Sequence, residues 1–342
     1  MFKTKSLEKI GLISTILLSF FSWIITYKLG LSTIYNDAMS HLDLSRLVID
    51  NIQPGLTQLG GTWLPLTHVL ALSLVWNDWA WHSGIAITVF SMIFFVLSVC
   101  AVYLTVKRVT ASPGASFLSA LFFATNLNIL YLQSTPLLEP AYLGCFLLSI
   151  YFFTKWLLGD DPIFLSISGF FGFLSVLIRY DGWFVTPIQA LLVMVVVLLV
   201  RRKPISEAIG SLLIFIMPSI FGMMLWMVWN VLIFGDPTYF FLGHYSAHAQ
   251  QFEIEKRVGL ITHRSIVKSL QAYGFAALDN VGYIVTALSA VLIVSGAIIL
   301  TSSKVRMFVP PVPKSGLKIL RVTFLPRTGA KKSMFSEIPS GE

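Results

Sequence analysis

Long apolar runs separated by short polar segments dominate the pattern along this chain. A run of about 20 apolar residues is the length at which an α-helix crosses the hydrocarbon core of a bilayer. The stretch Leu64–Val75 is apolar but too short to span, so it is predicted to be interfacial or re-entrant. The pattern therefore predicts an all-α fold, a polytopic bundle of about eight transmembrane helices. The predicted spans are Ile10–Tyr27, Gly84–Val106, Ala115–Leu132, Ala141–Leu158, Ile163–Ile178, Phe184–Val200, Ile209–Phe234 and Tyr283–Leu300.

The composition agrees with this pattern. Of the 342 residues, 56% are hydrophobic and 12% are charged, with a mean hydropathy of +0.80. A soluble domain carries roughly twice that share of charged residues. No P-loop, HExxH or paired CxxC motif is present, so soluble nucleotide, zinc-protease and redox functions gain no support. The net charge of +8 lies in short clusters between the apolar runs, which predicts a lipid bilayer and not nucleic acid as the partner.

The basic clusters predict the orientation. Lys107, Lys155 and Arg201 each follow or end a span that returns to the side of the N-terminus. Because cytoplasmic loops are enriched in Lys and Arg, we expect an integral protein of the cell (plasma) membrane with a cytoplasmic N-terminus. Residues 31–66 and 235–282 are then external loops with short interfacial helices. Residues 1–301 are predicted to form the transmembrane domain, and residues 302–342 a polar, disordered cytoplasmic tail.

Candidate chemistry begins in the first external loop. Asp37, His41 and Asp43 lie near one face if this segment is helical, since residues three and four apart are neighbours on a helix. His68 follows further along the same loop. The alternative is an ordinary solvated loop with a helix cap at Asn36 or Asp37.

Two later loops place charged residues at the same external face. Glu139 precedes Pro140, which is a normal helix start that also complements the helix dipole. Arg179 and Asp181 lie in the segment between the fifth and sixth spans. Arg179 is either an interfacial anchor or a ligand of phosphate, which a guanidinium binds in bidentate fashion.

Two histidines follow the seventh span. His244 and His248 are four residues apart, a helical spacing that can bind a metal. No third ligand is evident, so an amphipathic interfacial helix is the ordinary interpretation, and no metal site is predicted here.

Together these segments resemble the GT-C glycosyltransferase superfamily, the polyprenyl-phosphate-sugar-dependent membrane enzymes akin to protein O-mannosyltransferases and aminoarabinose transferases. The resemblance covers about Ile10 to Leu300. Here Asn36-Asp37 stands where the family often has two adjacent acidic residues. Members of the family usually have more spans and often a soluble external C-terminal domain, whereas about eight spans and a polar tail are predicted here. The resemblance to this superfamily rests on five segments, which are Tyr35-Asn36-Asp37, Trp63-Leu64-Pro65-Leu66-Thr67-His68, Thr135-Pro136-Leu137-Leu138-Glu139-Pro140, Leu177-Ile178-Arg179-Tyr180-Asp181-Gly182-Trp183 and Phe234-Gly235-Asp236-Pro237.

The resemblance implies a function. It implies transfer of a sugar from a polyprenyl-phosphate donor to a protein, lipid or glycan acceptor at the external face, with inversion and with Asp37 as the catalytic base. The residues then expected to bind substrate are His41, Asp43, His68, Glu139, Arg179 and Asp181. No cofactor is predicted, and a requirement for a divalent metal stays open. The competing hypotheses are a polytopic transporter or flippase, which predicts broken helices in two related halves, and an inactive member of the same superfamily.

Overall fold

The structure, a computed structural model, describes residues 2–301, and every regular element in that range is a helix. The prediction of an all-α fold is confirmed for these residues. The predicted disordered tail, residues 302–342, lies outside the described residues. The chain divides into two compact units, Met1–Tyr273 and a second unit that begins at Gly274. The described part of the second unit contains the end of α14 (Ile266–Val281) and α15 (Tyr283–Thr301).

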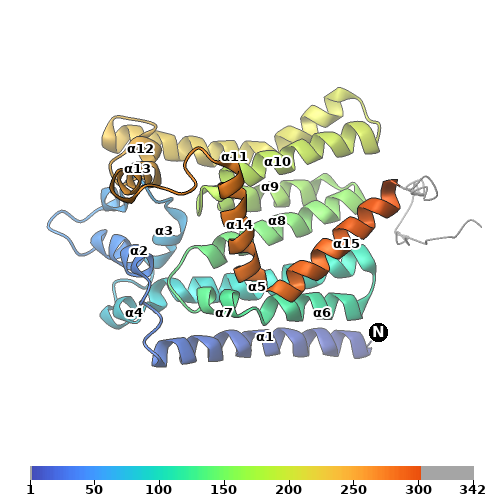
Figure 1. Ribbon diagram of the computed structural model, residues 1–342, viewed down its shortest axis with the longest axis horizontal. Helices are drawn as coiled ribbons and strands as arrows, with labels where there is room; N and C mark the ends of the chain where they lie inside the picture. The colour runs from blue at the N-terminus through green and yellow to red at the C-terminus, as the bar shows by residue number, and fades with distance from the viewer. Residues whose placement is uncertain (1, 302–342) are drawn as a thin grey trace, which may run out of the picture. The chain divides into compact units, whose positions relative to one another are not determined.

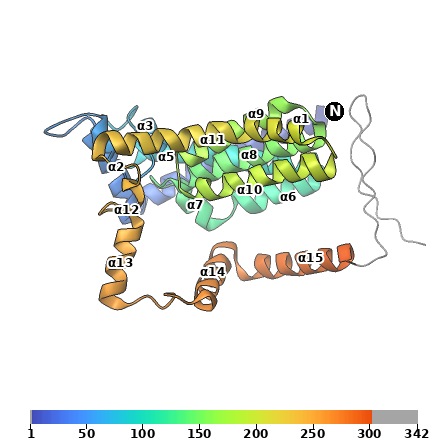
Figure 2. The ribbon, with the colours of Figure 1, turned by 90° about the horizontal axis from the view of Figure 1, so that it is seen from above.

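The first unit is a bundle of long helices that run side by side (Figures 1 and 2). In it α5 packs against α6 and α8, α9 packs between α8 and α11, and α10 contacts both α9 and α11. The first helix, α1, packs on α5 and α7. These helices are α1 (Phe2–Lys28), α5 (Ile85–Thr110), α6 (Pro113–Ala124), α7 (Leu127–Gln133), α8 (Glu139–Gly159), α9 (Pro162–Val176), α10 (Asp181–Val195) with its π-helical continuation (Val196–Val200), and α11 (Ile205–Phe234).

Within the described residues, five helices are long and apolar enough to cross a membrane, or up to seven if each of two bent helix pairs is one span. The predicted number of eight is not confirmed. The predicted span Ile163–Ile178 corresponds to α9, whose 15 residues extend about 22 Å. That length is less than the ~30 Å thickness of a hydrocarbon core, although α9 is flanked by longer helices.

The predicted span Ala115–Leu132 is two helices, α6 and α7, bent by 63°. The side chain of Asn126 accepts hydrogen bonds from the backbone N–H groups of Asn128 and Ile129 and so caps α7. The hydroxyl of Thr125 donates to the carbonyl of Leu121 at 2.8 Å in the last turn of α6. Local polar bonding thus ends one helix and starts another inside a segment whose apolar composition predicts a single span.

Small residues let the bundle helices approach closely. A Cβ added to Gly169 on α9 would lie 2.4 Å from the backbone oxygen of Phe215 on α11. At Gly144 on α8, a Cβ would lie 2.7 Å from the ring of Phe94 on α5. Contacts of this kind are typical of membrane helices. Lipid tails are as apolar as the side chains, so the hydrophobic effect does not drive these helices together, and close packing of small residues does.

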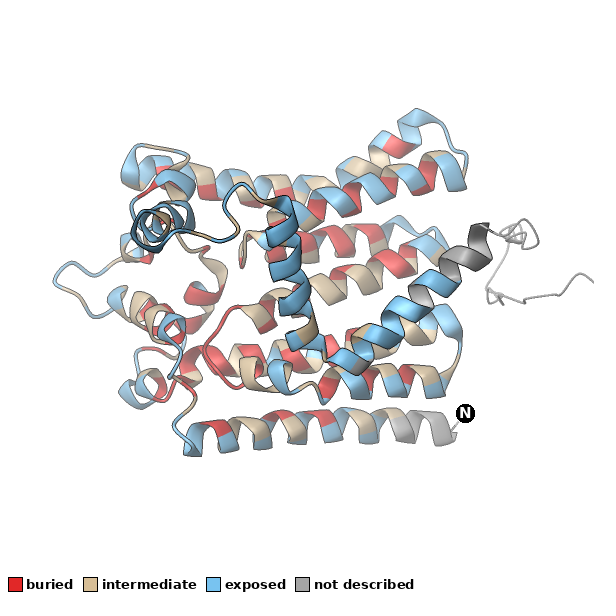
Figure 3. Cartoon of the chain, viewed as in Figure 1, coloured by how far each residue is buried: buried red, intermediate tan, exposed pale blue. Residues whose placement is uncertain are grey.

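The lateral surface of the bundle is apolar. Large apolar side chains are exposed along α1, α6, α10 and α11, among them Phe21, Phe122, Leu191 and Leu232. Exposed positions recur along the helices of the bundle in Figure 3. A soluble protein rarely exposes a continuous apolar surface on this scale, and lipid is the medium that can cover it. The helices and their surface are those of an integral membrane protein.

The two ends of the first unit differ. One end carries the short elements α2 (Asn36–Leu47), η1 (Leu56–Leu59), α3 (Leu66–Ala71), α4 (Asp78–His82), α12 (Tyr239–Leu242) and α13 (Ala247–Val258) (Figure 1). Leu42 of α2 packs there with Ala71, Val75 and Ile87, so the short apolar stretch after Pro65 is part of a small core. The other end carries the N-terminus (Figure 1).

Candidate functional site

The tight turn between α9 and α10 places Arg179 at the end of the bundle that carries the short helices. Gly182 makes the turn feasible, because a Cβ there would lie 2.8 Å from the carbonyl carbon of Ser175. The backbone N–H of Leu66 donates to the carbonyl of Leu177 at 3.1 Å. This bond fixes the start of α3, and with it the first interhelical loop, against the turn.

Arg179 lies between two carboxylates from two helices. Its Nη1 donates to Oε1 of Glu139 at 2.6 Å, and its Nε donates to Oδ2 of Asp181 at 2.8 Å. Burial by itself lowers the pKa of Arg179, but the charges of Glu139 and Asp181 and the bond to Asp181 outweigh it and raise that pKa. The guanidinium is therefore a permanent cation, and its side chain remains 35% exposed.

Two helix N-termini meet at this arginine. Glu139 is the first residue of α8, and Asp181 is the first residue of α10. Each helix N-terminus carries the equivalent of about half a positive charge. The formal charge of the three side chains is −1, from one cation and two carboxylates, and the two helix ends together offset about one negative charge. The centre is close to electrically neutral and retains exposed cationic N–H groups.

A buried pair of imidazoles lies near Arg179. Nδ1 of His41 and Nε2 of His68 are 3.0 Å apart, and the ring of Trp63 lies 4.4 Å from that of His41. Burial, then the neighbouring His68 and Arg179, lower the pKa of His41 to about 3. Burial lowers the pKa of His68 to about 4, against the opposing effect of its bond to the backbone carbonyl of Leu64. Both imidazoles are therefore neutral at physiological pH.

Asp37 lies in the first turn of α2, one turn before His41. Its side chain is exposed and forms no hydrogen bond or ion pair within the part of the chain that the structure describes. The cap residue of α2 is Tyr35, with no side-chain capping bond, so a cap at Asn36 or Asp37 is wrong. The carboxylate of Asp37 is thus available to a substrate on the same helix face as His41.

Asp43 points to a different part of the fold. Its Oδ1 accepts a hydrogen bond from the indole N–H of Trp81 at 3.1 Å. Arg46, one turn further, pairs with Asp78 of α4 at 2.8 Å and lies over the ring of Trp81. The expectation that Asp43 shares a face with His41 is wrong, because two residues on an α-helix correspond to about 200° of rotation. Asp43 joins α2 to α4.

The loop before Trp63 is attached to α11 and to the α9–α10 turn. The indole N–H of Trp229 donates to the carbonyl of Gly60 at 2.8 Å. The hydroxyl of Tyr180 donates to the carbonyl of Thr62 at 2.7 Å and accepts from the indole of Trp226 at 3.1 Å. Sequence reasoning missed these anchors, since aromatic residues near span ends are also typical of the headgroup region.

Gly61 explains why this loop can lie so close to α11. A Cβ there would lie 2.5 Å from the ring of Phe234 and 2.6 Å from Oδ1 of Asn230. The adjacent pair Gly60-Gly61 is the sequence signal that such a close approach was to be expected.

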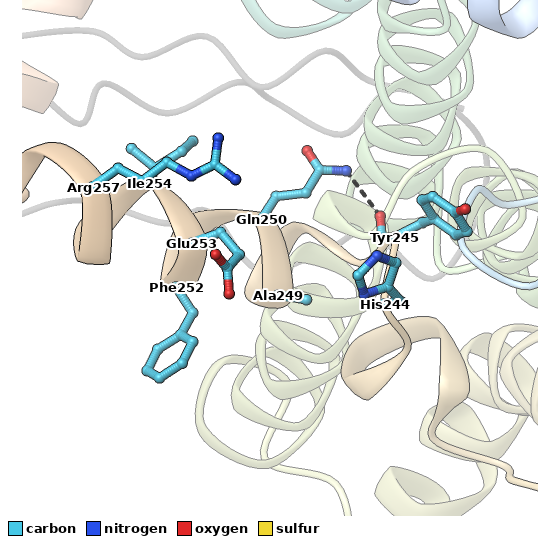
Figure 4. Close-up of a pocket in the computed structure, with 8 residues that line it drawn as sticks. All are labelled: His244, Tyr245, Ala249, Gln250, Phe252, Glu253, Ile254 and Arg257. Atoms are coloured by element: carbon cyan, nitrogen blue, oxygen red, sulfur yellow. Dashed lines mark hydrogen bonds between the residues drawn. The ribbon is translucent and has the colours of Figure 1, made fainter.

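His244 and His248 do not form the predicted helical pair. α12 ends at Leu242 and α13 begins at Ala247, so His244 precedes the helix that contains His248. A groove beside His244 is lined, among residues 2–301, by α13 and the loop before it alone (Figure 4). Its lining residues are His244, Tyr245, Ala249, Gln250, Phe252, Glu253, Ile254 and Arg257.

A metal ion held by protein ligands alone does not fit these residues. Among residues 2–301, no three His, Cys, Asp or Glu side chains are placed to hold one. Glu139 and Asp181, the carboxylates nearest the centre, are both engaged with Arg179.

The predicted site residues thus fall into two groups. Glu139 and Asp181 bond Arg179, and His41, which pairs with His68, is near enough to be affected by its charge. Asp37 lies one turn from His41, whereas Asp43 contacts α4. No model of a known protein family and no curated protein matches this sequence. What this site does is therefore inferred from its own geometry.

Proposed function

We propose that this chain is a membrane glycosyltransferase. It moves a sugar from a polyprenyl-phosphate donor to a hydroxyl of a protein, lipid or glycan acceptor on the external face, with inversion at the anomeric carbon. The observation that carries the proposal is the position of Arg179, a permanent cation with unused donors where two helix N-termini meet.

The donors of Arg179 suit a phosphate. A guanidinium has five N–H groups in a fixed fork. One bonds Glu139 and one bonds Asp181, and the described residues provide no hydrogen bond for the other three. Phosphate oxygens match such a fork, and helix N-termini favour anions. The two carboxylates hold the guanidinium in place, and the side chain remains partly exposed.

The chemistry of transfer needs few further groups. A sugar on a lipid phosphate already has a good leaving group, so one base for the acceptor hydroxyl is enough. Asp37 takes that proton, the acceptor oxygen bonds to the anomeric carbon, and the bond from that carbon to the phosphate oxygen breaks. The lipid phosphate leaves with the electron pair of that bond, and the guanidinium of Arg179 stabilises its negative charge.

The orientation is part of the proposal. Lys107 in the last turn of α5 pairs with Glu8 of α1, and Arg201, directly after the π-helical continuation of α10, pairs with Asp160, directly after α8. These ends of α5, α8 and α10 lie opposite the end of the bundle that carries the short helices (Figure 1). Since basic residues concentrate on the cytoplasmic side, this end with the N-terminus is cytoplasmic and the site faces outward.

The decisive test is transfer of radiolabelled sugar from polyprenyl-phosphate donors in membranes that contain this chain. Asp37→Asn preserves shape but removes the base. We expect it to lower turnover by about 10²–10⁴-fold while donor binding persists, because general base catalysis typically contributes that factor.

Asp43→Asn is the matched control, since Asp43 lies on the same helix and contacts Trp81 instead of the site. It should retain near-normal turnover. If Asp43→Asn abolishes transfer and Asp37→Asn does not, the base is wrongly assigned. If neither matters, Glu139 becomes the candidate base.

Transport is the second candidate, and the 63° bend between α6 and α7 favours it, because transporters bind substrates at broken helices. Uptake or flipping of a labelled polyprenyl phosphate by vesicles, without any sugar transfer, is the result that would select transport.

A further inference from the structure

The hydrogen bonds of the His41–His68 pair fix the position of each proton. Nδ1 of His68 is 3.0 Å from the carbonyl oxygen of Leu64, and a carbonyl only accepts, so this nitrogen carries hydrogen. A neutral His68 then has its lone pair on Nε2, which accepts from Nδ1–H of His41 at 3.0 Å. The remaining nitrogen of the pair, Nε2 of His41, is left as a lone-pair acceptor.

That nitrogen is not used by the protein. Within residues 2–301, Nε2 of His41 has no hydrogen-bond partner. This atom is not fully buried, although His41 as a whole is only 6% exposed. A small part of its surface therefore remains accessible to a ligand. The rings of Trp63 and His68 lie against the imidazole. They hold it in one orientation.

The surroundings keep the acceptor neutral. Burial and the positive charge of Arg179 both act against protonation of His41. A lone pair held beside a phosphate-binding cation is suited to a hydroxyl, which donates to nitrogen. A carboxylate or phosphate has no proton to donate and gains nothing there.

We propose that Nε2 of His41 accepts a hydrogen bond from a hydroxyl of the bound substrate, with His68 as the positioning residue that fixes the tautomer and ring of His41. This inference rests on the proposed transferase function and adds a specificity contact to it. The hydroxyl belongs either to the sugar of the donor or to the acceptor. No proton is transferred at His41, because the proton of the attacking hydroxyl goes to Asp37.

The first experiment measures donor binding and transfer for His41→Phe, which keeps an aromatic ring but removes both nitrogens. Loss of one neutral hydrogen bond corresponds to about a tenfold change. A tenfold weaker donor affinity assigns the contact to the donor sugar. A tenfold higher KM for the acceptor with unchanged donor affinity assigns it to the acceptor. His82→Phe is the control, because His82 is exposed on α4 and bonds only its own helix.

The second experiment separates positioning from folding. His68→Gln offers a side-chain oxygen to Nδ1–H of His41 and should retain most activity, whereas His68→Leu offers none and should resemble His41→Phe. Histidine-selective ¹⁵N spectra of the wild-type protein at pH 7 should show His41 protonated on Nδ1 and unprotonated on Nε2, with the Nε2 signal moving when substrate binds.

The outcomes are distinct. A wild-type chain that transfers sugar while His41→Phe keeps both constants overturns this inference and leaves the transferase standing. A His41 protonated on Nε2 in the wild-type spectra also overturns it. A wild-type chain that neither binds nor transfers from any polyprenyl-phosphate donor overturns the proposed function, and this inference with it.

Discussion

The contact between α9 and α11 makes a quantitative prediction about Gly169. Its missing Cβ would lie 2.4 Å from the backbone oxygen of Phe215 and 3.1 Å from its Cα. Ordinary heavy-atom contacts lie near 3.5 Å, so Gly169→Ala requires the two helices to separate by roughly 1 Å. A backbone oxygen cannot swing aside as the end of a side chain can, so the whole helix must move.

The expected loss of stability follows from two opposing effects. Overpacking of this kind costs about 1–3 kcal/mol. Alanine gains about 1 kcal/mol over glycine in helix propensity. A clash with backbone, which cannot rotate away, belongs in the upper part of the overpacking range, about 2–3 kcal/mol. The net loss is then about 1–2 kcal/mol, which lowers Tm by about 2–8 °C for a unit of this size. Thermal unfolding in detergent, followed by the amount of protein that remains monodisperse, measures it.

Gly210→Ala is the matched control. Gly210 also lies within a helix, α11, but a Cβ added there meets no atom within 4 Å. It should be neutral or slightly stabilising. Shortening the Phe215 side chain should not rescue Gly169→Ala, because the clash is with backbone. Equal stability of the two alanine variants would refute the inferred backbone contact.

Three further predictions address the site and the topology. Arg179→Lys should weaken donor binding about tenfold or more, because an ammonium carries its three donors on one nitrogen and lacks the planar fork that bonds both carboxylates and still has three donors left for a phosphate. Donor titration measures this loss, and an unchanged donor affinity in Arg179→Ala would mean that Arg179 acts only as an interfacial anchor. An impermeant thiol reagent added from outside should label a cysteine placed at Ser40 and spare one placed at Arg202. Labelling at Arg202 instead would contradict the proposed orientation. Acid should destabilise the fold through the pair His41 and His68: their folded pKa values of about 3 and about 4 lie below the unfolded value, so the unfolded state binds more protons. Their stabilising contribution is complete above about pH 6.5 and falls by about 2 kcal/mol per histidine at pH 5; unfolding at both pH values, with a variant that lacks both imidazoles, tests this slope.

Membrane-helix character could be predicted from the sequence because it depends on composition over about 20 residues. The apolar runs at α1, α5, α8, α10 and α11 each became a helix long enough to span. The number of spans could not be predicted from the sequence, because it depends on local hydrogen bonds that end one helix and start another. Asn126 breaks one apolar run, and α9 ends four residues before the next helix begins.

The candidate residues of the site could be predicted individually, since charged residues and histidines are few among so many apolar ones. Their association could not be predicted. Asp37, His41 and Asp43 lie within seven positions of one another, yet helix rotation turns Asp43 to Trp81 and His41 to His68. Sequence proximity says little about direction once the backbone is helical.

The sequence by itself determined that this protein is built from membrane-spanning helices, because the free energy of placing apolar segments in lipid is a sum over residues. Only the tertiary structure decided which polar groups share a site. Arg179 meets Glu139 across 40 positions of the chain, and His41 meets His68 across 27. Such pairings depend on how closely α9 packs between α8 and α11, and on a loop that Gly61 allows to lie against α11. Packing geometry is set by the shapes of many side chains at once, and no single segment encodes it.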